Sequence, residues 1–248
     1  MPVAACLLIR YVDREALPTS VRAGPRSGRS QTLGIPMPEE HNTPAIGWVP
    51  AWADLLGRTA EAADAGFVVG GEPGQVVEGQ EYVALWPGQD AEEFAAKAAG
   101  EGGRLTLLCA DAGSADGLAP GGLTRASERV LLMAPTAELN TDVELPENSQ
   151  VALAPMETYD AVEITVFDRP VARGRVQVRD DFATVAITEV PEGPEKEMFE
   201  RGLFAAMAEE AFLHGAEYLH MVVEPDAAGH FEESGWTEAG RLVGFEKN

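Results

Sequence analysis

The sequence predicts an α/β protein of the α+β type, made of two tandem units whose mixed, mainly antiparallel sheets are flanked by helices. Two observations predict this fold. In the second half, three strand-like runs precede a long helix and a buried apolar strand, an order typical of a strand meander that continues into a helical crossover. The order helix, strand, short segment, strand also occurs earlier in the chain, offset by 113 residues, so that Gly102 corresponds to Gly215.

The composition indicates a folded, acidic protein. Its 248 residues include 18 basic and 41 acidic ones, which gives a formal net charge of −23, and 45% of them are apolar. A chain this apolar can bury a core, unlike a globally disordered one. The acidity argues against non-specific binding to nucleic acid or to anionic membranes, because both reward clustered Lys and Arg. We therefore expect neither as a partner.

The cysteines and the apolar runs predict a cytoplasmic protein. Cys6 and Cys109 both lie inside apolar stretches, and two buried thiols suit a reducing compartment better than a disulfide framework does. No run approaches the ~20 apolar residues of a membrane span. The apolar residues 1–9 lack a basic segment before them and end at Arg10, so they are typical of a strand rather than of a signal peptide.

The first half is predicted to begin with an N-terminal strand and an arm rich in Arg, Pro and Ser, over residues 1–45. Residues 1–30 carry five arginines against two acids, a local charge of +3, so the remainder carries −26. Two readings of the arm stay open, docking on an acidic face or an ordinary surface loop.

Beyond the arm, a helix is predicted over 51–65 and ends at Gly66. A second helix is predicted over 90–100, with Asp90 as its N-cap. The expected strands are short and apolar: 67–69, 81–86, 104–110 and 129–133. Residues 136–149, with their Pro and Asn, are predicted to form a linker.

The second half has clearer periodicity. Three β-rich runs separated by turn-like Asp and Arg residues predict a meander: 161–167, 171–178 and 182–190. An Ala- and Met-rich helix follows over 198–214 and ends at Gly215. Residues 218–223 form a near-continuous apolar run, as expected of a central strand that is covered on both faces. A helical piece over 227–233 and a strand over 241–245 complete the chain.

This half resembles the GNAT superfamily of N-acetyltransferases over about 145–248. The resemblance rests on the hairpin strand Asp168-Arg169-Pro170-Val171-Ala172-Arg173-Gly174-Arg175-Val176, on the strand, helix and strand that follow, and on His230-Phe231-Glu232-Glu233-Ser234-Gly235-Trp236. The last stretch is similar to the family's Leu-Tyr-x-x-x-Gly-Phe signature. Through the internal repeat, residues 46–140 are expected to form a reduced GNAT-like unit, with the acetyltransferase domain over 141–248.

The resemblance implies acetyl-CoA as the co-substrate and a small-molecule or protein amine as the acceptor. In the family the pantetheine arm pairs with the exposed backbone of the strand before the main helix, which here ends near Val190. A Gln/Arg-x-x-Gly-x-Gly/Ala loop then binds the pyrophosphate at the helix N-terminus. That loop falls on residues 195–200, where Met198 and Glu200 occupy the glycine positions. A shifted frame uses Arg201 and Gly202 instead.

The resemblance also assigns candidates for acid–base chemistry. Glu189 is the candidate general base on the strand before the loop, and the alternative reading is a solvent-facing strand acid. Phe231 occupies the position where relatives have a Tyr that protonates the leaving thiolate, and it has no proton to give. His230 is the neighbouring candidate acid, unless it is a surface or packing residue.

The other histidines and the glycine clusters carry no further motif. The four histidines show no metal-ligand spacing that would predict a metal site. A second function therefore stays open, a catalytically silent GNAT-fold binding or assembly module that has lost the pyrophosphate loop. An excess of acid near the acceptor site would favour a cationic amine, and the sequence leaves homo-oligomerisation open.

Overall fold

A computed structural model describes residues 46–63, 66–71, 79–88, 91–139 and 142–247. The predicted N-terminal strand and arm, residues 1–45, and the predicted N-cap Asp90 lie outside the described residues. Four α-helices are present in the described part: α1 (Val49–Leu55), α2 (Ala91–Glu101), α3 (Lys196–Leu213) and α4 (Pro225–Glu232). The same residues also contain two short 3₁₀ helices, η1 (Ala112–Ala115) and η2 (Pro120–Gly122).

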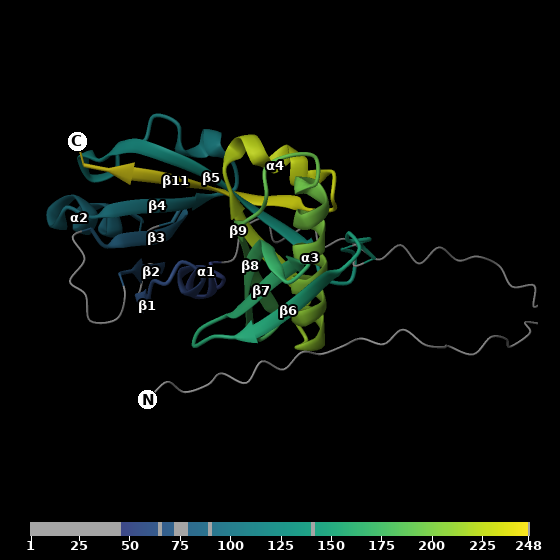
Figure 1. The fold of residues 1–248 in the computed structure, drawn as a ribbon. Helices are drawn as coiled ribbons and strands as arrows, with labels where there is room; N and C mark the ends of the chain where they lie inside the picture. The colour runs from purple at the N-terminus through teal and green to yellow at the C-terminus, as the bar shows by residue number, and fades with distance from the viewer. Residues whose placement is uncertain (1–45, 64–65, 72–78, 89–90, 140–141, 248) are drawn as a thin grey trace, which may run out of the picture. The chain divides into compact units, whose positions relative to one another are not determined.

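The described strands form one eleven-stranded sheet (Figure 1). In chain order its strands are β1 (Ala60–Ala63), β2 (Gly66–Val69), β3 (Glu81–Trp86), β4 (Arg104–Cys109), β5 (Thr124–Pro135), β6 (Ser149–Pro155), β7 (Asp160–Val166), β8 (Arg169–Arg179), β9 (Phe182–Glu189), β10 (Tyr218–Val223) and β11 (Thr237–Glu246). Their order across the sheet is β1-β2-β3-β4-β11-β5-β10-β9-β8-β7-β6. Only β3 with β4 and β9 with β10 pair in parallel among these strands. The predicted mixed, mainly antiparallel α+β fold is confirmed.

Helices cover both faces of this sheet. On one face α3 and α4 pack over β5 and β7–β10, while α2 packs over β3, β4 and β11. On the other face α1 covers the middle, where Trp48 and Trp52 contact apolar side chains of β3, β4, β5 and β11. The predicted central strand, β10, lies between β5 and β9, as expected.

The two halves of the described chain contain the same order of elements. Helix α2, strand β4, the 3₁₀ helices η1 and η2, and strand β5 correspond in order to α3, β10, α4 and β11. Strands β5 and β11 pair antiparallel, and Arg129 lies opposite Leu242. These two residues are 113 positions apart, which is the offset of the internal repeat. Each is therefore the counterpart of the other in the two halves. A two-fold relation between the halves would place its axis there.

The predicted helix over 51–65 is wrong in its second part. Helix α1 ends at Leu55, and Gly57 follows with a φ of 68°, a conformation that glycine adopts without strain. Ala60–Ala63 then form β1 and pair with β2. Alanine has a high helix propensity, so this strand depends on its hairpin partner rather than on local preference. Strand β6, at the sheet edge, was not predicted.

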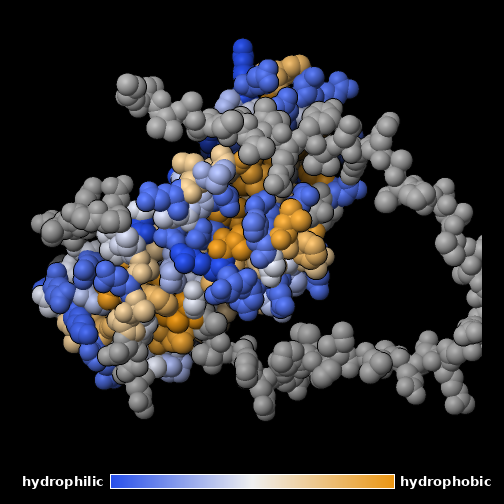
Figure 2. Space-filling model, turned by 90° about the horizontal axis from the view of Figure 1, so that it is seen from below, coloured by the Kyte–Doolittle hydropathy of each residue, from blue (hydrophilic) through white to orange (hydrophobic). Residues whose placement is uncertain are grey.

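No helix of the described residues is long and apolar enough to span a membrane. On the face that Figure 2 presents, hydrophobic side chains gather in patches that hydrophilic ones divide. Seven large apolar side chains of the described residues are exposed: Leu56, Val151, Met156, Phe167, Phe212, Leu213 and Tyr218.

Candidate functional site

Strands β9 and β10 diverge after a short parallel contact. Their register covers three residue pairs, from Phe182 with Tyr218 to Thr184 with His220. Beyond that point the facing backbone edges, residues 185–189 and 221–223, do not pair with each other, although β9 still pairs with β8 and β10 with β5. Strands β3 and β4, the other parallel pair, stay in register over six pairs. The divergence therefore belongs to the second half alone.

The divergence has an inner end, at Thr184 and His220, and an outer end, where β9 finishes at Glu189. The N-terminus of α3 follows the outer end in the chain. Val190 follows β9 directly, and α3 begins six residues later at Lys196. The first four N–H groups of a helix have no partner within it. In α3 these are the amides of residues 195–198, because Phe199 makes the first bond of the helix, to the carbonyl of the N-cap Glu195 at 3.1 Å. Of these four amides, that of Lys196 donates to the carbonyl of Gly193 at 3.2 Å. The amides of Glu197 and Met198 therefore remain for water or for an anionic ligand.

The side chains around this helix start are mainly acidic. Residues 192–201 hold four glutamates against Lys196 and Arg201. Both cations are engaged with glutamates of the same segment, Lys196 with Glu192 at 3.7 Å and Arg201 with Glu197. The dipole and free amides of α3 fit a pyrophosphate, whereas the glutamates oppose it.

The other predicted loop residues lie inside α3. Met198 is half-buried and packs against the core, and Glu200 is 8% exposed. Gly202 lies on the buried side of the second turn. A Cβ there would lie 2.8 Å from Cδ2 of Leu145 and 3.0 Å from Cδ1 of Ile164, so Gly202 lets α3 approach the sheet closely.

His230 and Phe231 lie on α4 and contact α3. The Nε2 atom of His230 is 3.0 Å from Oε2 of Glu200. Phe231 is buried and packs edge-on against Phe204, with the ring centroids 5.7 Å apart. The structure thus brings the predicted residues Glu200 and His230 into contact, and this contact links α3 to α4.

Glu189 lies at the outer end of β9, and its ion pair includes neither Glu200 nor His230. Its carboxylate accepts a hydrogen bond from Nη1 of Arg173 at 2.7 Å, and Arg173 also binds Glu163 at 2.8 Å. These three side chains form a surface row across β7, β8 and β9. As an ion-paired, exposed group, Glu189 is available to solvent and to an incoming cation.

Two residues that sequence reasoning did not single out lie at the inner end of the divergence. Thr184 is fully buried, and its Oγ1 has no hydrogen-bond partner. His220 is half-buried, and its Nδ1 also has none. Burial lowers the pKa of His220 to about 4, against the opposing effects of a hydrogen bond with the backbone of Ala183 and of the charge of Asp181. Only a tertiary feature identifies this pair, because the sequence presents both within apolar strands.

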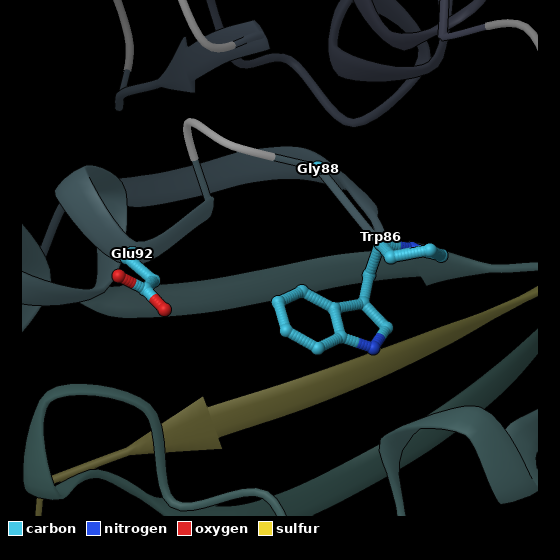
Figure 3. Close-up of a pocket in the computed structure, with 4 residues that line it drawn as sticks. Trp86, Gly88 and Glu92 are labelled. Atoms are coloured by element: carbon cyan, nitrogen blue, oxygen red, sulfur yellow. The ribbon is translucent and has the colours of Figure 1, made fainter.

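A pocket of about 480 Å³ lies elsewhere, where β3 leads into α2. Trp86, Pro87, Gly88 and Glu92 line it, and Figure 3 shows the indole of Trp86 and the carboxylate of Glu92 bordering the same space. The indole Nε1 donates to the carbonyl of Ser114 at 3.1 Å. Since β3 and β4 remain paired up to Trp86, this pocket is a surface hollow and not a gap between strands. No cluster of three metal-ligating side chains occurs in the described part of the chain.

No model of a known protein family matches this chain, and no curated protein sequence does. Solved structures do match it. One, described as a GCN5-related N-acetyltransferase from Kribbella flavida, has a TM-score of 0.57 and 18% identity, over 79% of this chain and 93% of that one. Another, described as a tandem GNAT protein from the clavulanic acid biosynthesis pathway, has a TM-score of 0.50 and 11% identity, over 73% of this chain and 77% of that one. At these identities the likeness shows the fold alone, and that fold is the GNAT fold.

Proposed function

We propose that this chain is a GNAT-type N-acetyltransferase, which moves the acetyl group of acetyl-CoA to an amine at the divergence of β9 and β10. The observation that carries the proposal is the divergence itself. It leaves two facing backbone edges without a strand partner, and backbone groups in that state must be satisfied by water or by a ligand. An extended chain with amides, such as pantetheine, satisfies them as an added strand would.

The outer end of the site would hold the anionic part of the co-substrate. The free amides of Glu197 and Met198 and the positive end of the α3 dipole are the groups that favour a pyrophosphate there. Lys196 and Arg201 supply the nearby cations once they exchange their glutamate partners for phosphate. Val190, between β9 and α3, would contact the pantetheine where it enters.

The roles of Glu189 and His230 remain proposals drawn from the resemblance. Glu189 is exposed at the entrance and pairs with Arg173, a position where it would attract a cationic acceptor, a small-molecule or protein amine, and accept its proton. His230 is the candidate acid for the departing thiolate, since Phe231 has no ionisable group.

A second function has its own support, a GNAT-fold module that binds or assembles without catalysis. Met198 and Glu200 occupy the positions where the family has glycines, and Glu200 contacts His230 across α3 and α4 at 3.0 Å. Both features place side chains where a co-substrate needs close approach to the backbone.

We further propose that the chain arose as two GNAT-like units in tandem, with the first reduced. The matching order of elements and the pairing of Arg129 with Leu242 support this. The first unit would then be structural, because its parallel strands β3 and β4 stay paired and offer no edge to a ligand.

Acetyl-CoA is expected to raise the melting temperature of the full chain. A ligand at 100 times its dissociation constant stabilises the folded state by about 2.7 kcal/mol. Differential scanning fluorimetry with acetyl-CoA, and with ATP as the control anion, measures this effect.

The double variant Met198→Gly, Glu200→Ala restores the family's loop pattern and is expected to bind acetyl-CoA more tightly than the natural chain. A flat melting temperature for the natural chain at millimolar acetyl-CoA, together with a response of the double variant, would favour the silent module.

A further inference from the structure

Thr184 and His220 form the last residue pair before β9 and β10 separate. Because they are in-register partners in a parallel pair, their side chains lie next to each other on one face of the sheet, on strands about 4.8 Å apart. That face is the one covered by α1, since the neighbouring Phe182 and Val222 pack with the α1 core. The face with α3 and α4 is the opposite one.

Each of these side chains has a buried polar atom without a hydrogen-bond partner. Such atoms destabilise the folded state when nothing satisfies them, so native proteins usually pair them. The first half shows the usual outcome: Thr106 of β4, equally buried in the sheet, donates to Oε1 of Glu81 at 2.7 Å. Nε1 of Trp48, Oγ of Ser149 and Nε1 of Trp236 also lack a partner, elsewhere in the described chain. The Thr184 hydroxyl and Nδ1 of His220 are in-register neighbours at the point where β9 and β10 separate.

The position of this pair relative to α3 gives it a role in the proposed reaction. Thr184 lies six residues before Val190 on an extended strand, a distance of about 20 Å. A pantetheine that enters at the α3 end and lies along β9 therefore brings its thioester to the inner end, beside Thr184 and His220.

We propose that Thr184 and His220 form the acceptor end of the site, where Nδ1 of His220 takes the proton of the attacking amine and the Thr184 hydroxyl hydrogen-bonds the reacting carbonyl. This inference rests on the proposed acetyltransferase function. The nitrogen lone pair of the amine attacks the thioester carbon, and the C–N bond forms. The C–S bond breaks, and its electron pair leaves on the sulfur of CoA. The proton released from nitrogen passes to Nδ1, and then to solvent.

The environment keeps the imidazole ready for this role. Burial favours the neutral ring, and a neutral imidazole has one nitrogen with a free lone pair. Asp181, in the turn before β9, is the charged group that acts on the ring, and its charge opposes the effect of burial. Phe182 packs edge-on against the ring at 5.6 Å and holds its orientation.

Two substitutions test the inference in the full chain. His220→Asn keeps a polar group near the Nδ1 position but cannot accept a proton. It is expected to lower kcat/KM for acetyl transfer by about 100-fold or more, the usual contribution of a general base. Thr184→Val removes only the hydroxyl. It is expected to lower kcat by about tenfold while leaving the melting temperature unchanged or higher, because an unpartnered buried hydroxyl stabilises nothing.

The assay follows CoA release from acetyl-CoA with primary amines, spermidine, glucosamine and a peptide with a free N-terminus. Both variants are expected to keep the natural dissociation constant for acetyl-CoA within about twofold. His214→Asn is the matched control, because His214 is 61% exposed at the end of α3, and it is expected to have natural activity.

Natural activity in folded His220→Asn and Thr184→Val would overturn the inference and leave the acetyltransferase function standing. If His220→Asn does not fold, Thr184→Val decides alone. A natural chain that binds no acetyl-CoA would overturn both proposals.

Discussion

Replacing Glu81 with alanine is expected to destabilise the fold by about 3 kcal/mol, because it removes a buried carboxylate from two half-buried arginines and a buried threonine. Glu81 is 4% exposed, and its carboxylate contacts Nη1 of Arg58 at 2.6 Å and Nη2 of Arg129 at 3.7 Å. Thr106 donates to it as well, so the variant would also orphan a buried hydroxyl. Glu81 of β3 thus links Arg58, which follows α1, to Thr106 of β4 and Arg129 of β5. Its loss is expected to weaken the contacts between these strands.

Urea unfolding measures this effect, and Glu189→Ala is the matched control. Glu189 also binds an arginine at 2.7 Å, but its side chain is 59% exposed, and exposed ion pairs contribute about 0–1 kcal/mol. Equal losses for the two variants would mean that burial does not set the strength of the Glu81 network.

The second large effect is the acid sensitivity that His220 gives to the fold. Its pKa is about 4 in the folded chain against 6.5 for a free histidine. Between these values only the unfolded chain binds the proton, so stability is lost as the pH falls from 6.5 towards 4. At 1.36 kcal/mol per pKa unit, the loss between pH 7.5 and pH 4.5 is about 2.5 kcal/mol.

The substitution His220→Asn removes this contribution. The difference in unfolding free energy between pH 7.5 and pH 4.5 is expected to be smaller in the variant by about 2.5 kcal/mol, measured by urea unfolding. His214→Asn, at an exposed position, is expected to behave as the natural chain does. An unchanged acid sensitivity in His220→Asn would mean that folding does not lower the pKa of the ring.

Most of the second half could be predicted because its patterns are local. The alternation along β7, β8 and β9 and the apolar run of β10 each specify a strand without outside information. The strand β1 could not be predicted, since Ala60–Ala63 favour a helix until β2 pairs with them. The edge strand β6 begins at Ser149, where the predicted linker ends, and no strand was predicted over its residues.

Only part of the candidate site could be predicted from the sequence, because some of its features depend on contacts between residues that are distant in the chain. The resemblance located β9, Val190 and the start of α3, and the structure places them together at one end of the divergence. The role of Gly202 could not be read from the sequence, because it depends on Leu145 and Ile164, which are distant in the chain. Likewise, Thr184 and His220 stand out only because Oγ1 of Thr184 and Nδ1 of His220 find no partner after folding.

Hydrogen–deuterium exchange with and without acetyl-CoA tests the central claim most directly, because it reports which backbone amides the ligand covers. The account predicts slower exchange in residues 185–190, at 197–198 and in residues 221–223 when acetyl-CoA is bound. It predicts no change in β3 and β4, whose amides already pair across the parallel contact. Protection confined to β3, β4 or the pocket at Trp86, or no protection at millimolar acetyl-CoA, would contradict a co-substrate site at the divergence of β9 and β10.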